Sequence, residues 1–389
     1  MVNIFFIVVF NISLFIIFWA MVGYPLSMKL LNRVYISRYT PKDYKHDPTV
    51  TIMVVAHNEE DVIKDKLQNI INLDYPKHKI KYLISSDNST DKTNEIVEEF
   101  IKQHPNENVY LHKVKNRLGK TNAQNEAQKL VNTEFLVMTD ANSILEKNAI
   151  RELMASFTSD DISYVTGKLI ISNEKSGSVS NSEAGYWNKD LEIREIESKI
   201  QTITAGNGAL YACRNSEYVD FEPIKSHDSN MPRYYALKRK RAISNHEAIA
   251  YEKAGEKIED EFKRKVRMNR RILQNILPDI RILNVFKYKW YSYFYFGHRT
   301  CRYLLWIAHL LLFISNVILI SEQWIYLVTF VGQGAFYFLA LIKLILKCNN
   351  KYINLIYYYC VTLSAQWVGV YNILTGKAKP FWEKAESTR

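Results

Sequence analysis

The sequence predicts an α/β domain built on a parallel sheet and attached to a membrane by apolar helices. Between residues 49 and 142, apolar and β-branched runs of strand length alternate with segments whose apolar residues recur at helical spacing. Strands that alternate with helices form parallel sheets that are covered on both faces. One long uncharged apolar run lies near the N-terminus and three more follow residue 303. Runs of this length are typical of helices that cross a bilayer.

Four strands are expected in the first half of the soluble domain. Each is a short apolar run that is followed by a polar cluster and then by a helical pattern. The runs are Val50 to Ala56, Ile80 to Ser85, Val109 to Lys113 and Phe135 to Thr139. Ligands of such sheets bind at the carboxyl ends of the strands. The polar clusters are therefore the candidate functional segments.

The cluster Asp140-Ala141-Asn142 suits a divalent cation. Its two oxygen-bearing side chains lie two residues apart and bracket a small residue. Hard divalent cations prefer oxygen ligands and share them with phosphates. The cluster from Asp87 to Asp91 has a simpler explanation, because Ser, Thr and Asp cap the helix that follows. Capping does not account for Asp140 and Asn142, since Ser143 alone suffices to cap a helix there.

Taken together, the clusters resemble the motifs of the family 2 glycosyltransferases, over about residues 49–273. The matching segments are Val54 to Glu60, Ser86 to Thr93, Gly119 to Asn125 and Asp140-Ala141-Asn142, the last at the family's Asp-x-Asp position. The resemblance implies an α/β, Rossmann-like GT-A glycosyltransferase domain, here joined to α-helical transmembrane segments. The chain departs from the family pattern at Asn88, where Gly is common, and at Asn142, where the last acid is usual.

The resemblance also implies a donor site for a nucleotide sugar, with a UDP-sugar expected. Donor contacts are expected from Ala56, Asn58, Glu59, Asp87, Lys120 and Asp140. Mg²⁺ or Mn²⁺ is expected on Asp140 and Asn142. Arg264 and Arg267 lie where related synthases carry a Gln-x-x-Arg-Trp motif, and they are expected to neutralise the leaving diphosphate. A solvated or lipid-facing basic helix is the simpler alternative for most of the cations in that stretch.

Two further segments resemble the acceptor side of the family's site. Thr204 to Ala212 resembles the small-residue segment beside the acceptor, so Gly206, Asn207 and Gly208 are expected to contact it. A plain turn before a strand explains the same residues. Ser226-His227-Asp228 matches the position of the catalytic base, which makes Asp228 the expected base, while His227 replaces the usual first acid. A lone Asp in a loop is otherwise a turn or capping residue.

The N-terminal apolar run, Phe5 to Tyr24, is expected to be a membrane anchor. It carries no charge and is long enough to cross a bilayer as a helix. An anchor is favoured over a cleaved signal peptide because no basic stretch precedes the run and no small-residue cleavage site follows it. The basic residues of the linker place the next domain in the cytoplasm by the positive-inside rule. They are Lys29, Arg33, Arg38, Lys42 and Lys45.

Six parts are expected along the chain. They are an N-terminal transmembrane helix (1–27), a basic linker (28–48), the cytoplasmic glycosyltransferase domain (49–275), an interfacial amphipathic segment (276–302), about three C-terminal transmembrane helices (303–375) and a basic tail (376–389). This organisation predicts a multi-pass protein of the cell membrane that contacts the lipid bilayer. Four crossings would place the basic tail outside, against the positive-inside tendency, so the number of C-terminal spans stays open.

The composition restricts the function classes. The 389 residues include 51 Lys and Arg against 40 Asp and Glu, and this formal charge of +11 suits an anionic membrane, an anionic substrate or nucleic acid. Nucleic acid is not expected as a partner, because the basic residues flank membrane segments instead of interleaving with aromatics on one soluble face. The four cysteines are scattered, which predicts neither a zinc site nor a disulfide framework.

The expected activity is an inverting transfer of a sugar from the nucleotide sugar to a growing polysaccharide at the membrane. Transfer of a single sugar to a lipid or lipid-linked acceptor is the nearest alternative. A nucleotide-binding membrane scaffold without catalysis is an alternative of another class, because Asn142 and His227 stand where acids are usual. The sequence leaves the oligomeric state open.

Overall fold

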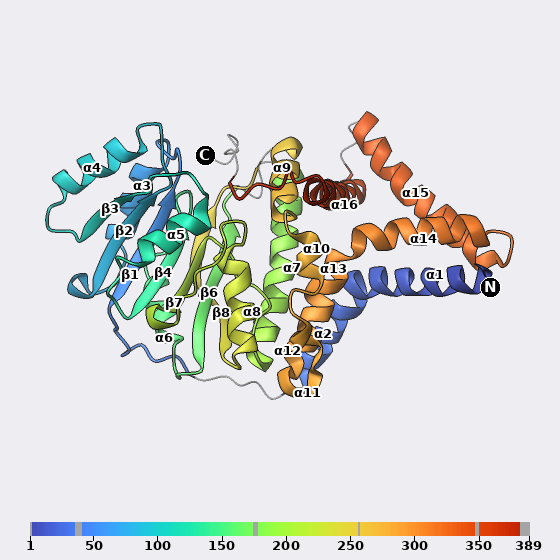
Figure 1. The fold of residues 1–389 in the computed structure, drawn as a ribbon, viewed down its shortest axis with the longest axis horizontal. Helices are drawn as coiled ribbons and strands as arrows, with labels where there is room; N and C mark the ends of the chain where they lie inside the picture. The colour runs from blue at the N-terminus through green and yellow to red at the C-terminus, as the bar shows by residue number, and fades with distance from the viewer. Residues whose placement is uncertain (1, 36–40, 174–177, 256, 347–349, 382–389) are drawn as a thin grey trace.

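A computed structural model describes residues 2–35, 41–173, 178–255, 257–346 and 350–381. An α/β domain forms one end of the molecule, and a group of long helices projects from the other (Figure 1). Arg38 of the basic linker and residues 382–389 of the predicted tail lie outside the described residues.

An eight-stranded mixed sheet forms the centre of the α/β domain, in the order β3-β2-β1-β4-β7-β6-β8-β5. The four strands of the first half run parallel, as the sequence predicts. They are β1 (Val50–Ala56), β2 (Ile80–Ser86), β3 (Val109–Lys113) and β4 (Phe135–Asp140). Because the polar clusters follow parallel strands, they meet at one edge of the sheet.

The second half of the sheet contains both parallel and antiparallel strand pairs. Strand β7 (Leu210–Arg214) runs antiparallel to both β4 and β6 (Ile162–Ile171), and β8 (Arg241–Glu252) runs parallel to β6. The short strand β5 (Ile144–Leu145) pairs antiparallel with β8 at the edge. The antiparallel β7 brings the segment before it to the carboxyl ends of β1 and β4.

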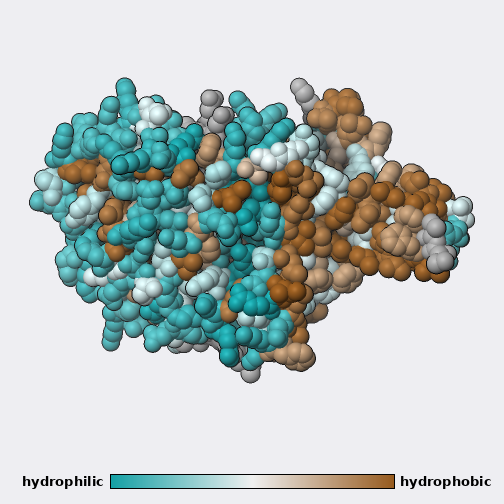
Figure 2. All heavy atoms as spheres, in the orientation of Figure 1, coloured by the Kyte–Doolittle hydropathy of each residue, from teal (hydrophilic) through white to brown (hydrophobic). Residues whose placement is uncertain are grey.

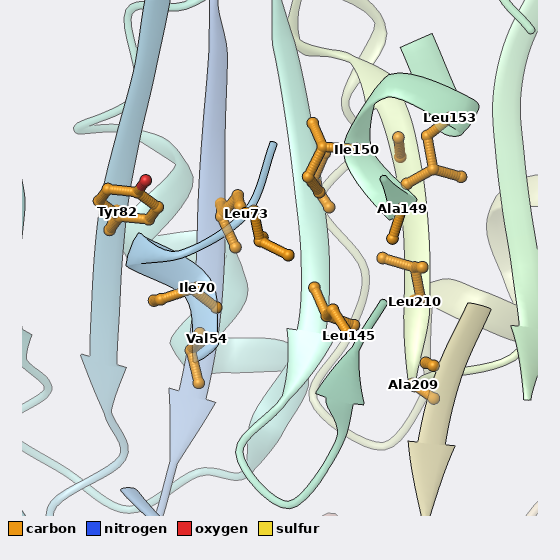
Figure 3. Close-up of a cluster of buried hydrophobic side chains, with 14 of the residues drawn as sticks. Val54, Ile70, Leu73, Tyr82, Leu145, Ala149, Ile150, Leu153, Ala209 and Leu210 are labelled. Atoms are coloured by element: carbon orange, nitrogen blue, oxygen red, sulfur yellow. The ribbon is translucent and has the colours of Figure 1, made fainter. Parts of the chain in front are cut away.

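Alternate residues of the central strands belong to two hydrophobic cores. Val50, Ile52 and Val54 of β1 pack in one apolar cluster, and Met53 packs in the other. The first cluster is covered by α3 (Ile63–Ile71), α4 (Thr93–Gln103) and α6 (Ala149–Ala155), and Figure 3 shows part of it. The second is covered by α5 (Lys120–Gln128) and α8 (His227–Leu237). The alternation is that of strands buried on both faces.

The remaining helices link this domain to the projecting end. Helices α7 (Ser178–Ile200), α9 (Ile258–Met268) and α10 (Ile272–Ile276) lie between the two ends (Figure 1). Short helices follow at α11 (Val285–Tyr288), α12 (Trp290–Phe294) and α13 (Cys301–Tyr303), with a π-helical turn between the last two. Tyr291, Phe294 and Tyr295 of this region are buried, whereas Phe286 is exposed. The interfacial assignment of residues 276–302 stays a prediction.

The projecting helices carry the apolar surface. Helix α1 (Val2–Phe18) continues through a π-helical turn into α2 (Tyr24–Val34) and lies beside α14 (Leu305–Leu319). Helices α15 (Trp324–Leu346) and α16 (Lys351–Leu374) complete the group. Hydrophobic surface is concentrated on this end, whereas the α/β domain is mostly hydrophilic (Figure 2).

Two described helices are long and apolar enough to cross a membrane, judged by length and composition. They are Asn3–Val34 and Trp324–Leu346. A third span exists if Trp290–Tyr303 and Leu305–Leu319, which meet at 62°, count as one broken span. Helix α16 is not among them, and it packs against α9 of the α/β domain, where the Tyr358 hydroxyl donates to Glu261 over 2.8 Å. The number of membrane crossings therefore stays a prediction.

Candidate active site

Three of the residues singled out by the sequence meet around Gly208, in the segment that leads into β7. A Cβ atom built on Gly208 would lie 3.2 Å from Oδ2 of Asp140, 3.2 Å from Nζ of Lys120 and 4.0 Å from Oδ2 of Asp228. These side chains come from β4, from the first residue of α5 and from the first turn of α8. Any side chain at this position would enter the space between the ends of these three side chains.

The Lys120 ammonium donates a hydrogen bond to Oδ1 of Asp140. Burial disfavours the charged form of Lys120, but the carboxylates of Asp140 and Asp228 outweigh it and raise the pKa of Lys120. The ammonium therefore stays charged beside two acids. This contact between the Lys120 ammonium and Asp140 shows that the Asp140 carboxylate is placed to accept a cation.

The turn from Asp140 to Asn142 fits a hard divalent cation only in part. Asp140 and Asn142 are half-buried, with Ala141 buried between them. No group of three or more His, Cys, Asp or Glu that could hold a metal occurs among the described residues. One carboxylate and one amide oxygen are a fitting partial ligand set for Mg²⁺ or Mn²⁺, which take further oxygens from phosphates and water.

Asp87 organises the loop in front of Lys120. Its two carboxylate oxygens accept the backbone N–H groups of Leu118 and Gly119, over 3.3 and 3.0 Å, and its own N–H donates to the carbonyl of Ala56 over 2.8 Å. Burial raises the pKa of Asp87, although the two N–H donors act against the shift. Ala56 and Asp87 thus join the ends of β1 and β2 to the start of α5.

The loop after β1 is held by the loop after β2. The side chain of Asn58 donates to the Thr90 hydroxyl over 3.2 Å and accepts the Thr90 N–H over 2.8 Å. The backbone N–H of Glu59 donates to the Thr93 hydroxyl over 2.8 Å, and Glu59 is itself buried. Asn58 adopts a φ of 55°, which Asn tolerates better than most residues. The contacts of Asn58 and Glu59 with the sugar donor stay predictions.

The segment expected to contact the acceptor offers only one of its three residues to the site. A Cβ on Gly206 would lie 1.9 Å from the Tyr164 hydroxyl, so Gly206 is needed for packing. The buried Asn207 side chain donates to the Gly167 carbonyl over 2.7 Å and accepts the Leu210 N–H over 3.2 Å. Gly208 is the one that borders Asp140 and Asp228.

The expected base, Asp228, lies in the first turn of α8 and not in a loop. His227 beside it points into the core, where its two ring nitrogens contact the Gln124 carboxamide at 2.9 Å and the Tyr218 hydroxyl at 2.8 Å. Burial lowers the pKa of His227 to about 3, which keeps the ring neutral. His227 thus supports α8 from the core, at the position where the family usually has the first acid.

The two arginines predicted on α9 have different surroundings. Arg264 makes two hydrogen bonds to the buried Glu261 carboxylate, at 2.7 and 3.1 Å. Burial, aided by Arg264 and Arg270, lowers the pKa of Arg267 to about 10, and the carboxylates of Asp140 and Glu252 oppose the shift. Arg267 is thus charged at neutral pH and lies within the electrostatic reach of Asp140.

Two residues near the site, Lys66 and Glu252, were not predicted from the sequence, whereas Arg270 belongs to the basic stretch in which diphosphate-neutralising cations were expected. Lys66 lies beneath the Asp140 turn, Glu252 contacts Ser143 at its end, and Arg270 interacts electrostatically with Asp228. One signal was present for Lys66, which interrupts the apolar face that Ile63, Leu67 and Ile70 form on one helix. Glu252 carried no signal beyond its position at the end of a strand.

Residues 51–217 match the family model described as glycosyl transferase family 2. The segment contains β2, β4 and all of β1 except Val50, together with Asp87, Lys120, Asp140 and Gly208. Residues 51–217 form a glycosyltransferase family 2 domain.

The chain is 27% identical over 175 residues to a beta-monoglucosyldiacylglycerol synthase of Nostoc sp., covering 43% of this chain and 37% of the relative. It is 32% identical over 174 residues to the poly-beta-1,6-N-acetyl-D-glucosamine synthase of Staphylococcus aureus, covering 44% of this chain and 40% of the relative.

The chain thus spans about two fifths of the length of these relatives. The match to the family model ends at residue 217, before Asp228 and α9. A solved structure resembles nearly the whole molecule. The mannosyltransferase PcManGT from Pyrobaculum calidifontis, in complex with GDP-Man and Mn²⁺, has a TM-score of 0.70 at 18% identity, covering 97% of this chain and 100% of that one. This likeness confirms the predicted GT-A fold.

Proposed function

We propose that the chain is a membrane-anchored glycosyltransferase that moves a sugar from a nucleotide-sugar donor, with inversion at the anomeric carbon, to a growing polysaccharide. The observation that carries the proposal is the meeting of Asp140, Lys120 and Asp228 around Gly208. A diphosphate needs cations, and an attacking hydroxyl needs a base. Both kinds of group border the same small space.

Asp228 is the proposed base. It takes the proton from the acceptor hydroxyl as the oxygen forms a bond to the anomeric carbon. The bond from that carbon to the diphosphate oxygen breaks in the same displacement, so no covalent intermediate is required. Gly208 leaves room for the acceptor beside the carboxylate.

Cationic groups stabilise the departing nucleoside diphosphate. Lys120 and Arg267 supply protein cations near Asp140. Asp140 and Asn142 would hold Mg²⁺ or Mn²⁺, which supplies Lewis-acid stabilisation of the leaving phosphate oxygens. Arg264 acts through its ion pair with Glu261, which anchors α9.

Asp87, Asn58 and Glu59 are proposed to form the nucleoside end of the donor site, with a UDP-sugar as donor. Their loops lie side by side at the ends of β1 and β2 and are joined by hydrogen bonds. PcManGT, whose structure contains GDP-Man and Mn²⁺, shares the fold. A GDP-sugar is therefore the second donor class to test.

The acceptor is proposed to be a polysaccharide, and a lipid acceptor is the second candidate. The poly-beta-1,6-N-acetyl-D-glucosamine synthase supports the first, and the beta-monoglucosyldiacylglycerol synthase supports the second. Either acceptor suits a site next to apolar helices. The same helices support a multi-pass location in the cell membrane with the glycosyltransferase domain in the cytoplasm.

The test uses the purified full chain in lipid nanodiscs with a panel of UDP- and GDP-sugars and Mn²⁺ or Mg²⁺. Released nucleoside diphosphate and product size are measured. We expect release with one donor, and we expect loss of at least about 100-fold in Asp140→Asn and in Asp228→Asn. Asp65→Asn, which removes an exposed acid of α3, serves as the matched control.

Product size separates the two acceptors. A polymer from one donor supports the polysaccharide synthase, whereas a single added sugar on a lipid supports the alternative. Binding of a nucleotide without release of diphosphate from any donor, with and without added acceptors, would instead identify a non-catalytic scaffold and overturn the proposal.

A further inference from the structure

Lys66 is a fully buried lysine beneath the proposed active site. It lies in the first turns of α3, on the helix face that packs on the sheet, and its exposed fraction is 0%. Transfer of an ammonium group from water into a protein interior costs several kcal/mol unless hydrogen bonds and nearby charges compensate. The position therefore calls for an explanation other than packing.

The two hydrogen bonds of Lys66 lie on either side of the proposed metal ligands. Its ammonium donates to the hydroxyl of Thr139 over 2.8 Å and to the backbone carbonyl of Ser143 over 2.5 Å. Thr139 directly precedes Asp140, and Ser143 directly follows Asn142. One side chain thus holds both ends of the turn that carries Asp140 and Asn142.

Both partners of Lys66 are themselves held by the surrounding site. The Thr139 hydroxyl donates to the carbonyl of Ala209 over 2.7 Å, next to Gly208. The Ser143 hydroxyl donates to the carboxylate of Glu252 at the end of β8. Lys66 therefore lies at the point where α3, the Asp140 turn, the Gly208 segment and β8 are joined by hydrogen bonds.

The charge balance beneath the turn also involves Lys66. Burial lowers the pKa of Lys66 to about 7, and the carboxylates of Asp140 and Glu252 oppose this shift. With Asn142 in place of an acid, the turn offers a single carboxylate to a cation. Correct placement of the Asp140 and Asn142 oxygens then matters more for affinity, because fewer charges contribute to binding.

We propose that Lys66 is a positioning residue for the divalent cation, which fixes the Asp140 to Asn142 turn so that both oxygen ligands face one ion. The inference rests on the proposed function, since it assumes that these two residues bind the metal. A packing role alone makes a different prediction. If Lys66 only fills space in the core, Lys66→Met keeps a side chain of similar size there, so the Mn²⁺ affinity would not change.

The experiment measures Mn²⁺ binding directly, by electron paramagnetic resonance and titration calorimetry, on the full chain in nanodiscs with UDP or GDP present. Lys66→Met is compared with wild type and with Lys64→Met, which removes an exposed lysine of the same helix. We expect at least about tenfold weaker Mn²⁺ binding in Lys66→Met, because second-shell partners of metal ligands contribute on this order. Lys64→Met should match wild type.

A second variant keeps the proposal testable if Lys66→Met does not fold. Thr139→Val preserves the volume of the side chain and removes the hydroxyl, while Lys66 and the Ser143 carbonyl remain. We expect its Mn²⁺ affinity to fall several-fold and its thermal midpoint to fall modestly, because the Lys66 ammonium and the Ala209 carbonyl each lose this hydrogen-bond partner. Wild-type affinity in a folded Lys66→Met or in Thr139→Val would overturn the inference.

The same experiment separates this inference from the proposed function. If wild type binds no Mn²⁺ with either nucleotide, the metal assignment of Asp140 and Asn142 fails, and the inference fails with it. If wild type binds Mn²⁺ and loses it in Asp140→Asn but not in Lys66→Met, the metal site stands and only the role of Lys66 is wrong.

Discussion

The backbone N–H of Gly206 donates a hydrogen bond to the carbonyl oxygen of Asp228 over 2.8 Å. In an unbroken helix this carbonyl would accept the N–H of residue 232. Residue 232 is a proline inside α8, and proline has no N–H. The proline therefore leaves the Asp228 carbonyl available, and the acceptor-side segment binds there. The helix that carries the proposed base is thus joined to the segment that borders the acceptor.

Pro232→Ala is expected to weaken this connection. The new N–H competes for the Asp228 carbonyl, while alanine improves the helix by up to about 3 kcal/mol of intrinsic propensity. We predict roughly tenfold lower kcat with an unchanged or higher thermal midpoint, because small misplacements of reacting groups are costly. The measurement is diphosphate release against donor concentration. Pro76→Ala, outside the site, is the control, and an unchanged kcat in Pro232→Ala would contradict the coupling.

Gly208→Ala is expected to abolish most of the transfer without unfolding the protein. The added methyl group would lie 3.2 Å from both the Asp140 carboxylate and the Lys120 ammonium, in the space proposed for the substrates. We predict at least about a 100-fold loss of kcat/KM, measured by diphosphate release, with a small change in thermal midpoint. Gly185→Ala in α7, where no atom of the described residues lies within 4 Å of the new Cβ, should retain activity. Similar activities of the two variants would exclude the assigned site.

Arg267→Met is expected to lower activity, whereas Arg264→Met is expected to lower stability. Arg267 lies within the electrostatic reach of Asp140, so its loss should lower kcat by roughly 100-fold with little change in stability. Arg264 pairs with the buried Glu261, so its loss should mainly lower the thermal midpoint. Kinetics and thermal unfolding are measured for both, with Lys263→Met on the exposed face of α9 as control. A larger kcat effect in Arg264→Met would reverse the assignment.

His227 predicts a specific loss of stability in acid. Burial lowers its pKa in the folded protein to about 3, against about 6.5 in the unfolded chain. Between these values the unfolded chain binds more protons, so the free energy of unfolding falls as the pH falls below about 6.5, by up to about 1.4 kcal/mol per pH unit. His227→Gln should show a shallower fall of the thermal midpoint from pH 6.5 to 4. His78→Gln, at an exposed position, should follow wild type; equal slopes in all three proteins would be incompatible with a neutral buried His227.

The strands of the first half of the sheet could be predicted because their signal is local. The run from Val50 to Ala56 forms β1 at those residues, and the predicted run from Ile80 forms β2 with one further residue at its end. The order and direction of β7, β6 and β8 could not be predicted, since pairing depends on contacts between distant segments. The alternative that Asp228 is a turn residue in a loop is wrong, since α8 begins at His227 and Asp228 lies in its first turn.

The sequence by itself determined the alternation of strands and helices, the motif residues at the strand ends and the apolar helices, because each depends on residues close together in the chain. Only the tertiary structure decided which of these residues share a space. Asp140, Lys120 and Asp228 meet around Gly208. The side chains of His227 and Asn207 are buried and bind other parts of the domain. Lys66 lies beneath the Asp140 turn. Such contacts follow from the packing of the sheet and its helices, which no local pattern encodes.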